Sequence, residues 1–200
     1  MSEQLASGPG GRIRGGAVPL VLVGILLAAA CSAEAEPPQP PLPTVPPVPA
    51  GWLEATNGDL SLTLPPWLVP FDTTASIFAN EVVEPGAEWI QLMAEGPRTA
   101  DLQPGPNESL EHWLRGRIDI GPGLGQPTIR QVNMPAGPTV SIERVDRAGT
   151  RLAWQIAAYA IRTPRGVAFL QIDGPPDKWP AREADLALIP WLIRVEPGSP

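Results

Sequence analysis

Four apolar segments in the second half of the chain, joined by short turns, constrain its fold more than any other feature. They cover Thr128–Met134, Thr139–Val145, Arg151–Arg162 and Val167–Asp173. Each connection carries Gly or Pro, the residues that tight turns favour. Since consecutive strands joined by short turns pair in the antiparallel sense, the pattern predicts an antiparallel meander of four strands.

The third of these segments is apolar on both faces. Trp154, Ile156 and Ala158 alternate with Tyr159 and Ile161. A strand that is apolar on both faces is covered on both faces. We therefore expect helices, or a helix with long loops, on each side of the sheet.

The preceding part of the chain predicts further strands and one helix. Leu60, Leu62 and Leu64 alternate with Ser61 and Thr63, which is typical of a half-buried strand. Other expected elements are strands over Ala75–Asn80 and Glu88–Glu95, a helix over Asn107–Asp119, and a closing helix from Trp179.

Both helices carry end signals. Asn107 suits the N-cap of the first helix, with Glu111 near its N-terminal end and Arg115 and Arg117 near its C-terminal end. Pro190 interrupts the closing helix, and it should kink or break that helix because it lacks an N–H group.

The N-terminus has the three parts of a secretory signal. Arg12 and Arg14 precede the apolar segment Ala17–Cys31, which closes with small residues. The segment is shorter than the ~20 apolar residues of a membrane-spanning helix. We therefore expect export by general secretion, with residues 1–30 as the signal peptide.

Cys31 is the only cysteine, and it stands where the apolar segment ends. Small residues before such a cysteine resemble the lipobox of bacterial lipoproteins, although Ala28 stands where the commonest box has Leu. The resemblance implies a lipid on Cys31 and attachment to the extracytoplasmic face of a bacterial cell membrane. Three alternatives stay open: cleavage at an A-x-A site with a soluble secreted product, an uncleaved N-terminal anchor, and a cysteine that only packs.

A proline-rich tether is expected over residues 31–51. Residues 34–50 hold eight prolines, and proline fixes φ and cannot donate to a helix or sheet. Polyproline II is then expected, as a semi-rigid spacer of roughly 50 Å at ~3.1 Å per residue. A single domain over residues 52–196 and a disordered tail over residues 197–200 complete the expected organisation.

The charge balance excludes some partners. The net charge is −7, and removing residues 1–30 takes away two arginines and one glutamate, which makes the rest more acidic. Such a chain has no basic surface for an anionic membrane or for nucleic acid. Lipid must then supply the membrane attachment, and no nucleic-acid partner is expected.

No residue pattern points to catalysis or to a metal. His112 is the only histidine, and with Ser109 one turn earlier it lacks the third group of a triad. A zinc site needs several His or Cys ligands. The loop Gly121–Gly125 lacks the Lys-Ser/Thr of a phosphate loop, and the acidic segment 81–88 fits no calcium loop. We expect no enzyme, no cofactor and no metal, and a surface position for His112.

Seven tryptophans are many for 200 residues. Most should lie in the core, because the indole ring buries a large apolar area. Trp52 and Trp67 lie near the entry of the domain and form a candidate recognition surface.

The order of elements resembles the PsbP-like fold of bacterial lipoproteins of the DcrB and LpqN type. The matching features are the L-x-L-x-L-P-P-x-W opening at Leu60–Trp67, the mid-chain helix, the meander and the closing helix. The resemblance implies an α+β fold, an α/β sandwich whose antiparallel sheet of about six strands is covered by helices. It implies no activity, because the members are mostly accessory, assembly or binding proteins.

Two functions follow as hypotheses. The first is a membrane-tethered, extracytoplasmic, non-catalytic module that binds a protein partner at the cell envelope. The second is a carrier of an apolar small ligand held between sheet and helix, which a fully packed core would exclude. An unrecognised hydrolase that uses His112 is a third.

Overall fold

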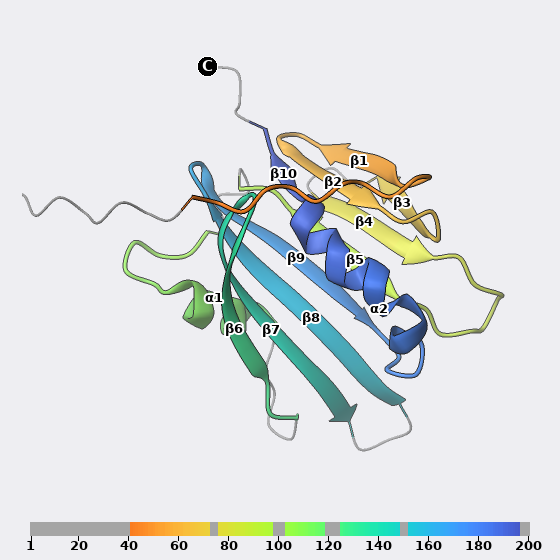
Figure 1. Ribbon diagram of the computed structural model, residues 1–200. Helices are drawn as coiled ribbons and strands as arrows, with labels where there is room; N and C mark the ends of the chain where they lie inside the picture. Colours follow the sequence, from red (N-terminus) through yellow and green to blue (C-terminus); the bar gives the residue numbers. More distant parts are fainter. Residues whose placement is uncertain (1–40, 73–75, 98–102, 119–124, 149–151, 197–200) are drawn as a thin grey trace, which may run out of the picture. The chain divides into compact units, whose positions relative to one another are not determined.

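The computed structural model describes residues 41–72, 76–97, 103–118, 125–148 and 152–196. These residues form two antiparallel sheets, two α-helices and one 3-10 turn (Figure 1). The smaller sheet has the strand order β1-β2-β10, and the larger has the order β3-β4-β5-β9-β8-β7-β6. The α+β fold class is as expected from the sequence.

The strands are β1 (Leu53–Asn57), β2 (Leu60–Leu64), β3 (Leu68–Asp72), β4 (Ser76–Glu81), β5 (Gln91–Glu95), β6 (Thr128–Met134), β7 (Gly137–Ala148), β8 (Leu152–Thr163), β9 (Gly166–Gly174) and β10 (Arg194–Val195). The helical elements are α1 (Leu110–Arg117), α2 (Trp179–Leu188) and the 3-10 turn η2 (Ile189–Leu192).

The meander is confirmed, since β6, β7, β8 and β9 are consecutive neighbours in the larger sheet. Its first turn depends on Gly137, whose φ is 148°. A Cβ atom at this position would lie 1.9 Å from the carbonyl oxygen of Arg162 on the neighbouring strand. Only glycine fits there, because a side chain at this position would clash with the backbone of β8.

The described residues form ten strands, more than the expected six or so. The unexpected ones are short: β1, β3 and β10. The edge strand β3 contains Pro70, which an edge tolerates because one side of the strand needs no ladder hydrogen bond. The strand expected from Glu88 begins only at Gln91, and Trp89 lies 41% exposed in the loop before it.

β2 corrects a second expectation. Its leucines are buried as predicted, but Ser61 and Thr63 are also buried, at 4% and 6% exposure. The strand is therefore not half-buried. It is the central strand of the smaller sheet, between β1 and β10, and both of its faces are removed from solvent.

Helix α1 begins later than the sequence indicated. Its N-cap is Ser109, whose extended backbone lets its Oγ accept a hydrogen bond from the N–H of His112 at 3.1 Å. The expected cap, Asn107, lies exposed before the helix. Serine and asparagine cap about equally well, so the choice depends on where the apolar face meets the sheet. The helix ends at Arg117 rather than Asp119.

Helix α2 begins at Trp179, with Pro180 in its first turn as predicted. It ends at Leu188, and the chain continues as η2, which contains Pro190. The predicted break is thus confirmed. None of the helices among the described residues is long and apolar enough to cross a membrane.

The two faces of the larger sheet carry separate apolar clusters. The α2 face packs against α2, η2 and β2, and the α1 face packs against α1. Strand β8 contributes Ala157, Tyr159 and Ile161 to the first cluster and Ile156, Ala158 and Ala160 to the second. The predicted covering of this strand on both sides is confirmed.

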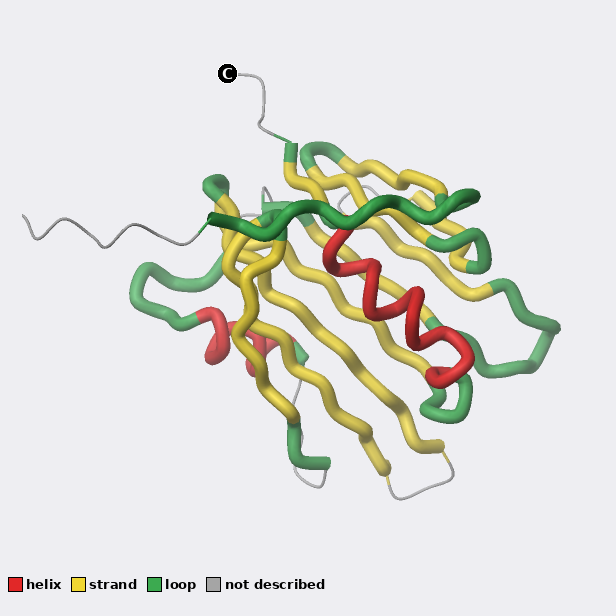
Figure 2. The backbone as a smooth tube through the Cα atoms, in the orientation of Figure 1, coloured by secondary structure: helices red, strands yellow, loops and turns green. Residues whose placement is uncertain are grey.

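Residues 41–50 of the expected tether lie on the side of the sheet that carries α2, as Figure 2 shows. Within this segment Pro43, Pro46 and Pro49 are half-buried and the remaining residues are exposed. A polyproline II helix has three residues per turn, so every third residue falls on one edge. The exposure pattern therefore indicates such a helix, with one edge lying against the domain.

Candidate functional site

Helix α2 is held to the sheet by a polar network on one of its sides. Nε1 of Trp67 donates a hydrogen bond to Oδ2 of Asp185 at 2.7 Å, and the guanidinium of Arg182 lies 4.5 Å from the centre of the Trp67 ring. Lys178 and Arg182 also contact the carboxylate of Glu81, at 3.4 and 3.2 Å. These contacts join the helix to β4 and to the start of β3.

Glu81 is the centre of this network. Burial alone would raise the pKa of its carboxyl. Hydrogen bonds from the N–H of Ile90 and from Arg182, together with the charge of Lys178, outweigh burial and lower the pKa below its usual value of 4.5. The carboxylate is therefore charged at neutral pH and holds both cations of the helix.

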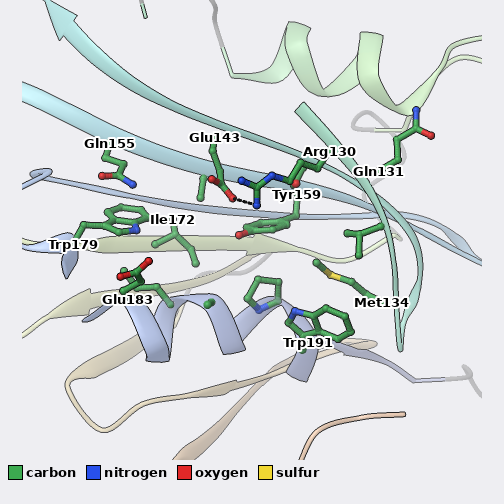
Figure 3. Close-up of a pocket in the computed structure, with 16 residues that line it drawn as sticks. Arg130, Gln131, Met134, Glu143, Gln155, Tyr159, Ile172, Trp179, Glu183 and Trp191 are labelled. Atoms are coloured by element: carbon green, nitrogen blue, oxygen red, sulfur yellow. Dashed lines mark ion pairs between the residues drawn. The ribbon is translucent and has the colours of Figure 1, made fainter. Parts of the chain in front are cut away.

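The other side of α2 faces an open part of the sheet and forms a groove with it (Figure 3). This α2 groove has a volume of about 600 Å³, within the ~300–1,000 Å³ of ligand pockets in proteins. Its floor is formed by Arg130, Gln131, Val132, Met134, Ser141, Glu143, Gln155, Ala157, Tyr159 and Ile172. Its helical wall is formed by Trp179, Glu183, Leu186, Ala187, Pro190 and Trp191.

Strand register explains why the floor residues other than Gln131 share one face. Arg130 pairs with Ser141, and Ser141 with Tyr159, so these three side chains form one row across β6, β7 and β8. Glu143, Ala157 and Ile172 form a neighbouring row. Side chains of directly paired residues lie on the same face of a sheet, which here is the face that α2 covers only in part.

Tyr159 lies near the middle of the floor (Figure 3). It is 8% exposed, and burial, reinforced by the charge of Glu143, raises the pKa of its hydroxyl to about 12. The hydroxyl is therefore neutral at physiological pH, and it can both donate and accept a hydrogen bond. No hydrogen bond to it is found within the described parts of the chain.

Tryptophans lie at both ends of the groove wall. Trp179 begins α2 and Trp191 lies in η2, so they are separated by about 18 Å at 1.5 Å per helical residue. Met134 lies near Trp191, and Gln155 and Glu183 lie near Trp179 (Figure 3). The groove is thus elongated, with a tryptophan at each end of its helical wall and polar side chains toward both ends.

One ion pair lies on the floor. Nη1 of Arg130 and Oε1 of Glu143 are 3.9 Å apart, and both side chains are more than one third exposed. An exposed pair at this distance contributes at most about 1 kcal/mol. Both groups therefore remain available to a ligand. Glu183, on the opposite wall, has no ion-pair partner among the residues that the structure describes.

A second hollow, of about 510 Å³, lies on the other face of β6. We call it the α1 hollow, because it lies between β6, β7 and the start of α1. It is lined by Ser109, Leu110, Glu111, Gln131, Val132, Asn133, Pro138, Thr139 and Val140. Gln131 and Val132 line both the α1 hollow and the α2 groove.

The sequence-predicted candidates lie elsewhere. Trp67 is engaged by Asp185 and Arg182, and Trp52 is half-buried; both pack against the cluster on the α2 face. Neither lines the α2 groove, and their role in recognition stays a prediction. Cys31 and residues 121–124 lie outside the described residues.

His112 lies on the exposed surface of α1, as predicted, with its side chain 81% exposed. Its Nε2 is 3.7 Å from Glu108, and Ser109 is occupied as the helix cap. Within the described ranges, no three His, Cys, Asp or Glu side chains come together as metal ligands.

The groove residues were not identified from the sequence, although one signal was present. Ser141, Glu143 and Gln155 interrupt the apolar strands of the meander, and the expected hairpin register places them on one face. Polar residues gathered on one face of an otherwise apolar sheet indicate that this part of the face is not covered by a helix.

Comparison with known proteins gives a fold but no family by sequence. No protein-family model matches the chain, and no curated protein matches it. The fold is similar to the solution structure of cyanobacterial PsbP (CyanoP) from Synechocystis sp. PCC 6803. The TM-score is 0.50 at 8% identity, over 72% of this chain and 92% of that one.

Two further structures are similar at lower scores. The Ran-binding protein Mog1p of Saccharomyces cerevisiae gives a TM-score of 0.49 at 10% identity, over 72% of this chain and 95% of that one. LpqN of Mycobacterium tuberculosis, which is involved in cell envelope biogenesis, gives 0.38 at 11% identity, over 76% and 82%. The CyanoP comparison supports the expected PsbP-like fold and says nothing of activity.

Proposed function

We propose that this chain is a non-catalytic binding module, tethered by lipid at Cys31 to the extracytoplasmic face of a bacterial membrane, where it serves a protein of the cell envelope. Its binding site is the α2 groove. The ligand places an elongated, mainly apolar part along the groove, between the Trp179 end and the Trp191 end.

The observation that carries this proposal is the open groove between sheet and helix. The carrier hypothesis required space at this place, and a groove of about 600 Å³ lies there. Its lining combines Trp179, Trp191 and Tyr159 with aliphatic side chains and with six polar or charged residues, Arg130, Gln131, Ser141, Glu143, Gln155 and Glu183. Aromatic and aliphatic walls with a few polar side chains are typical of ligand sites, because apolar contact supplies affinity and polar contact supplies orientation.

The chemistry of the lining supports binding rather than catalysis. A general base near neutral pH needs a pKa near 7, whereas the pKa of Tyr159 is raised to about 12. Glu143 lies beside Arg130. These groups are suited to hydrogen bonding and charge pairing with a ligand.

The experiment occupies the groove with a larger side chain on its helical wall and leaves the floor residues unchanged. Ala187 is exposed and lines the groove, whereas Ala184 is exposed on the same helix and does not line it. The probe is N-phenyl-1-naphthylamine, a neutral aromatic dye whose fluorescence rises in apolar surroundings. We expect the wild type and Ala184→Trp to bind the dye and Ala187→Trp to lose at least tenfold in affinity.

The result that contradicts the proposal is equal dye binding by both tryptophan variants, or no binding by the wild type. Circular dichroism of each variant checks that α2 is intact. Both substitutions add the same side chain to exposed positions of one helix, so a difference between them reports on the groove.

A further inference from the structure

The two edges of the larger sheet differ. Strand β3 forms one edge and carries Pro70, which has no N–H to offer to another strand. Strand β6 forms the other edge and contains no proline. Every second residue of an antiparallel edge strand directs its N–H and C=O away from its neighbour. Within the described residues, no backbone hydrogen bond from another segment reaches this side of β6.

The hollows on the two faces of β6 match the geometry of a strand. A strand added along the free side of β6 would direct successive side chains to opposite faces of the sheet. One set would then point toward the α2 groove and the other toward the α1 hollow. The two sites share Gln131 and Val132 as their common wall, so they lie on either side of the same stretch of edge.

The lining of the two hollows indicates which side chains the added strand would carry. On the α2 side, the half-buried Val132 and Trp191 offer an apolar surface. On the α1 side, the half-buried Leu110 offers apolar surface among polar side chains. Apolar side chains at alternating positions therefore find apolar contact on both faces.

The net charge of the chain and the carboxylate of Glu183, rather than the charges on β6 itself, favour a basic segment. Arg130 lies beside Glu143, and Glu111 is paired with Arg115 at 3.0 Å. Glu183 is left on the groove wall without an ion-pair partner among the described residues, and the chain carries a net charge of −7. An acidic peptide would be repelled, whereas a lysine or arginine in the groove would complement Glu183.

We propose that β6 accepts an extended, apolar and basic segment of a partner protein as an additional strand of the sheet, with its alternate side chains in the α2 groove and the α1 hollow. This inference rests on the proposed function, because it makes the peptide the ligand of the same groove. Main-chain hydrogen bonds to β6 supply affinity, and the two hollows select the side chains.

The probe is a displayed library of random linear peptides of about ten residues, which is longer than a typical strand. The library is selected on the full chain, and a selected peptide is then synthesised with single N-methyl groups along its backbone. N-methylation removes one N–H donor and leaves the side chains unchanged. We expect affinity to fall at least tenfold at every second position and to change little at the positions between.

A second measurement follows the backbone amides of β6 in the protein. Hydrogen exchange, followed residue by residue, should slow at alternate amides of Thr128–Met134 when the peptide binds. Gln131→Pro and Val132→Pro are a matched pair of variants, since each removes one backbone N–H from β6. One of these neighbouring residues directs its N–H toward β7, and the other directs it away from β7. We expect the outward-facing variant to fold and lose the peptide, and the inward-facing one to be destabilised.

Three results would overturn the inference. Selected peptides that bind without slower exchange in β6 and tolerate N-methylation would show a groove ligand that adds no strand. Failure to select any peptide, with dye binding intact, would leave the groove to a small molecule. Hydrogen exchange in β6 that slows with rising protein concentration, in the absence of peptide, would show that a second copy of the chain pairs with β6. In the first two cases the proposed function stands. The proposed function has its own test, and it fails if Ala187→Trp does not change the affinity for the dye.

Discussion

The indole of Trp67 and the carboxylate of Asp185 lie 118 positions apart in the chain and are joined by a hydrogen bond of 2.7 Å. The bond connects the start of the domain to the middle of its last helix. Since Asp185 lies on α2, the position of one groove wall depends on a residue that precedes nearly the whole sheet in sequence.

Trp67→Phe should therefore destabilise the domain. It removes the N–H donor and leaves the partly buried Asp185 without that partner, which costs about 1–3 kcal/mol. Urea unfolding measures the change. The control is Trp89→Phe, since Trp89 is 41% exposed and surface substitutions usually change stability by less than about 0.5 kcal/mol. Equal effects of the two substitutions would show that the hydrogen bond contributes nothing.

Tyr159 provides a direct test of the environment of the groove floor. It is the only tyrosine in the chain, so tyrosinate absorbance in a pH titration reports on this residue alone. We expect ionisation near pH 12 in the folded protein, from its pKa of about 12, and near pH 10 in denaturant, where the pKa returns to its ordinary value of about 10.

The same raised pKa has a consequence for stability. A group whose pKa is raised by folding contributes its full stabilisation below the unfolded pKa and loses it as the pH rises through the folded pKa. Stability should thus fall between about pH 10 and pH 12, by about 2–3 kcal/mol for two units. Tyr159→Phe should not show that fall. Ionisation of native Tyr159 near pH 10 would contradict its burial.

Glu81 predicts the opposite dependence at low pH. Its pKa is lowered in the folded state, so its contribution is fully present above the unfolded pKa and is lost as the pH falls through the folded pKa. Unfolding free energy should therefore decrease below about pH 4.5, and Glu81→Gln should reduce that decrease. The control is Glu84→Gln, at an exposed position. Identical pH profiles for the two variants would contradict this role of Glu81.

The described part of the tether gives a matched pair of neighbours. Pro46 is half-buried and Pro47 is exposed. Pro46→Ala should destabilise the domain by about 0.5–1 kcal/mol more than Pro47→Ala, because both substitutions loosen the unfolded chain but only the first removes packing. Thermal unfolding of the two variants measures the difference, and no difference would mean that the segment is only a spacer.

Cys31→Ser tests the lipid anchor. If the anchor is as proposed, the variant leaves the membrane fraction or retains its signal peptide, because the acyl chains supply the attachment. Membrane fractionation with a mass measurement distinguishes the two. A variant that stays in the membrane fraction after removal of residues 1–30 would exclude the lipid on Cys31.

The parts of the fold that follow from local patterns were predictable. The meander and the break at Pro190 follow from alternation, turn residues and the missing N–H of proline. Strand β3 was missed because Pro70 and the preceding Pro65-Pro66 argue against a strand, and only pairing with β4 overrides them. The N-cap was misplaced because Asn107 and Ser109 are equivalent locally, and contact with the sheet decides between them.

The site itself depends on tertiary structure. Trp191 and Met134 line the same groove only because α2 and η2 return over this face of the sheet, and no local pattern sets that return. The hydrogen bond between Trp67 and Asp185 likewise depends on tertiary structure, because these residues lie far apart in the chain. The polar residues on this face of the meander can be identified in the sequence. The groove above them cannot, because it depends on where α2 lies.

Pro70 in β3 also limits how large an assembly can become. A sheet with two open edges can stack head to tail, copy upon copy, into a filament. In this domain one edge lacks a donor where the next copy would need it. If a strand joins at β6 as proposed, Pro70 disfavours a repeat of the same contact at the β3 edge, because that position has no N–H to offer.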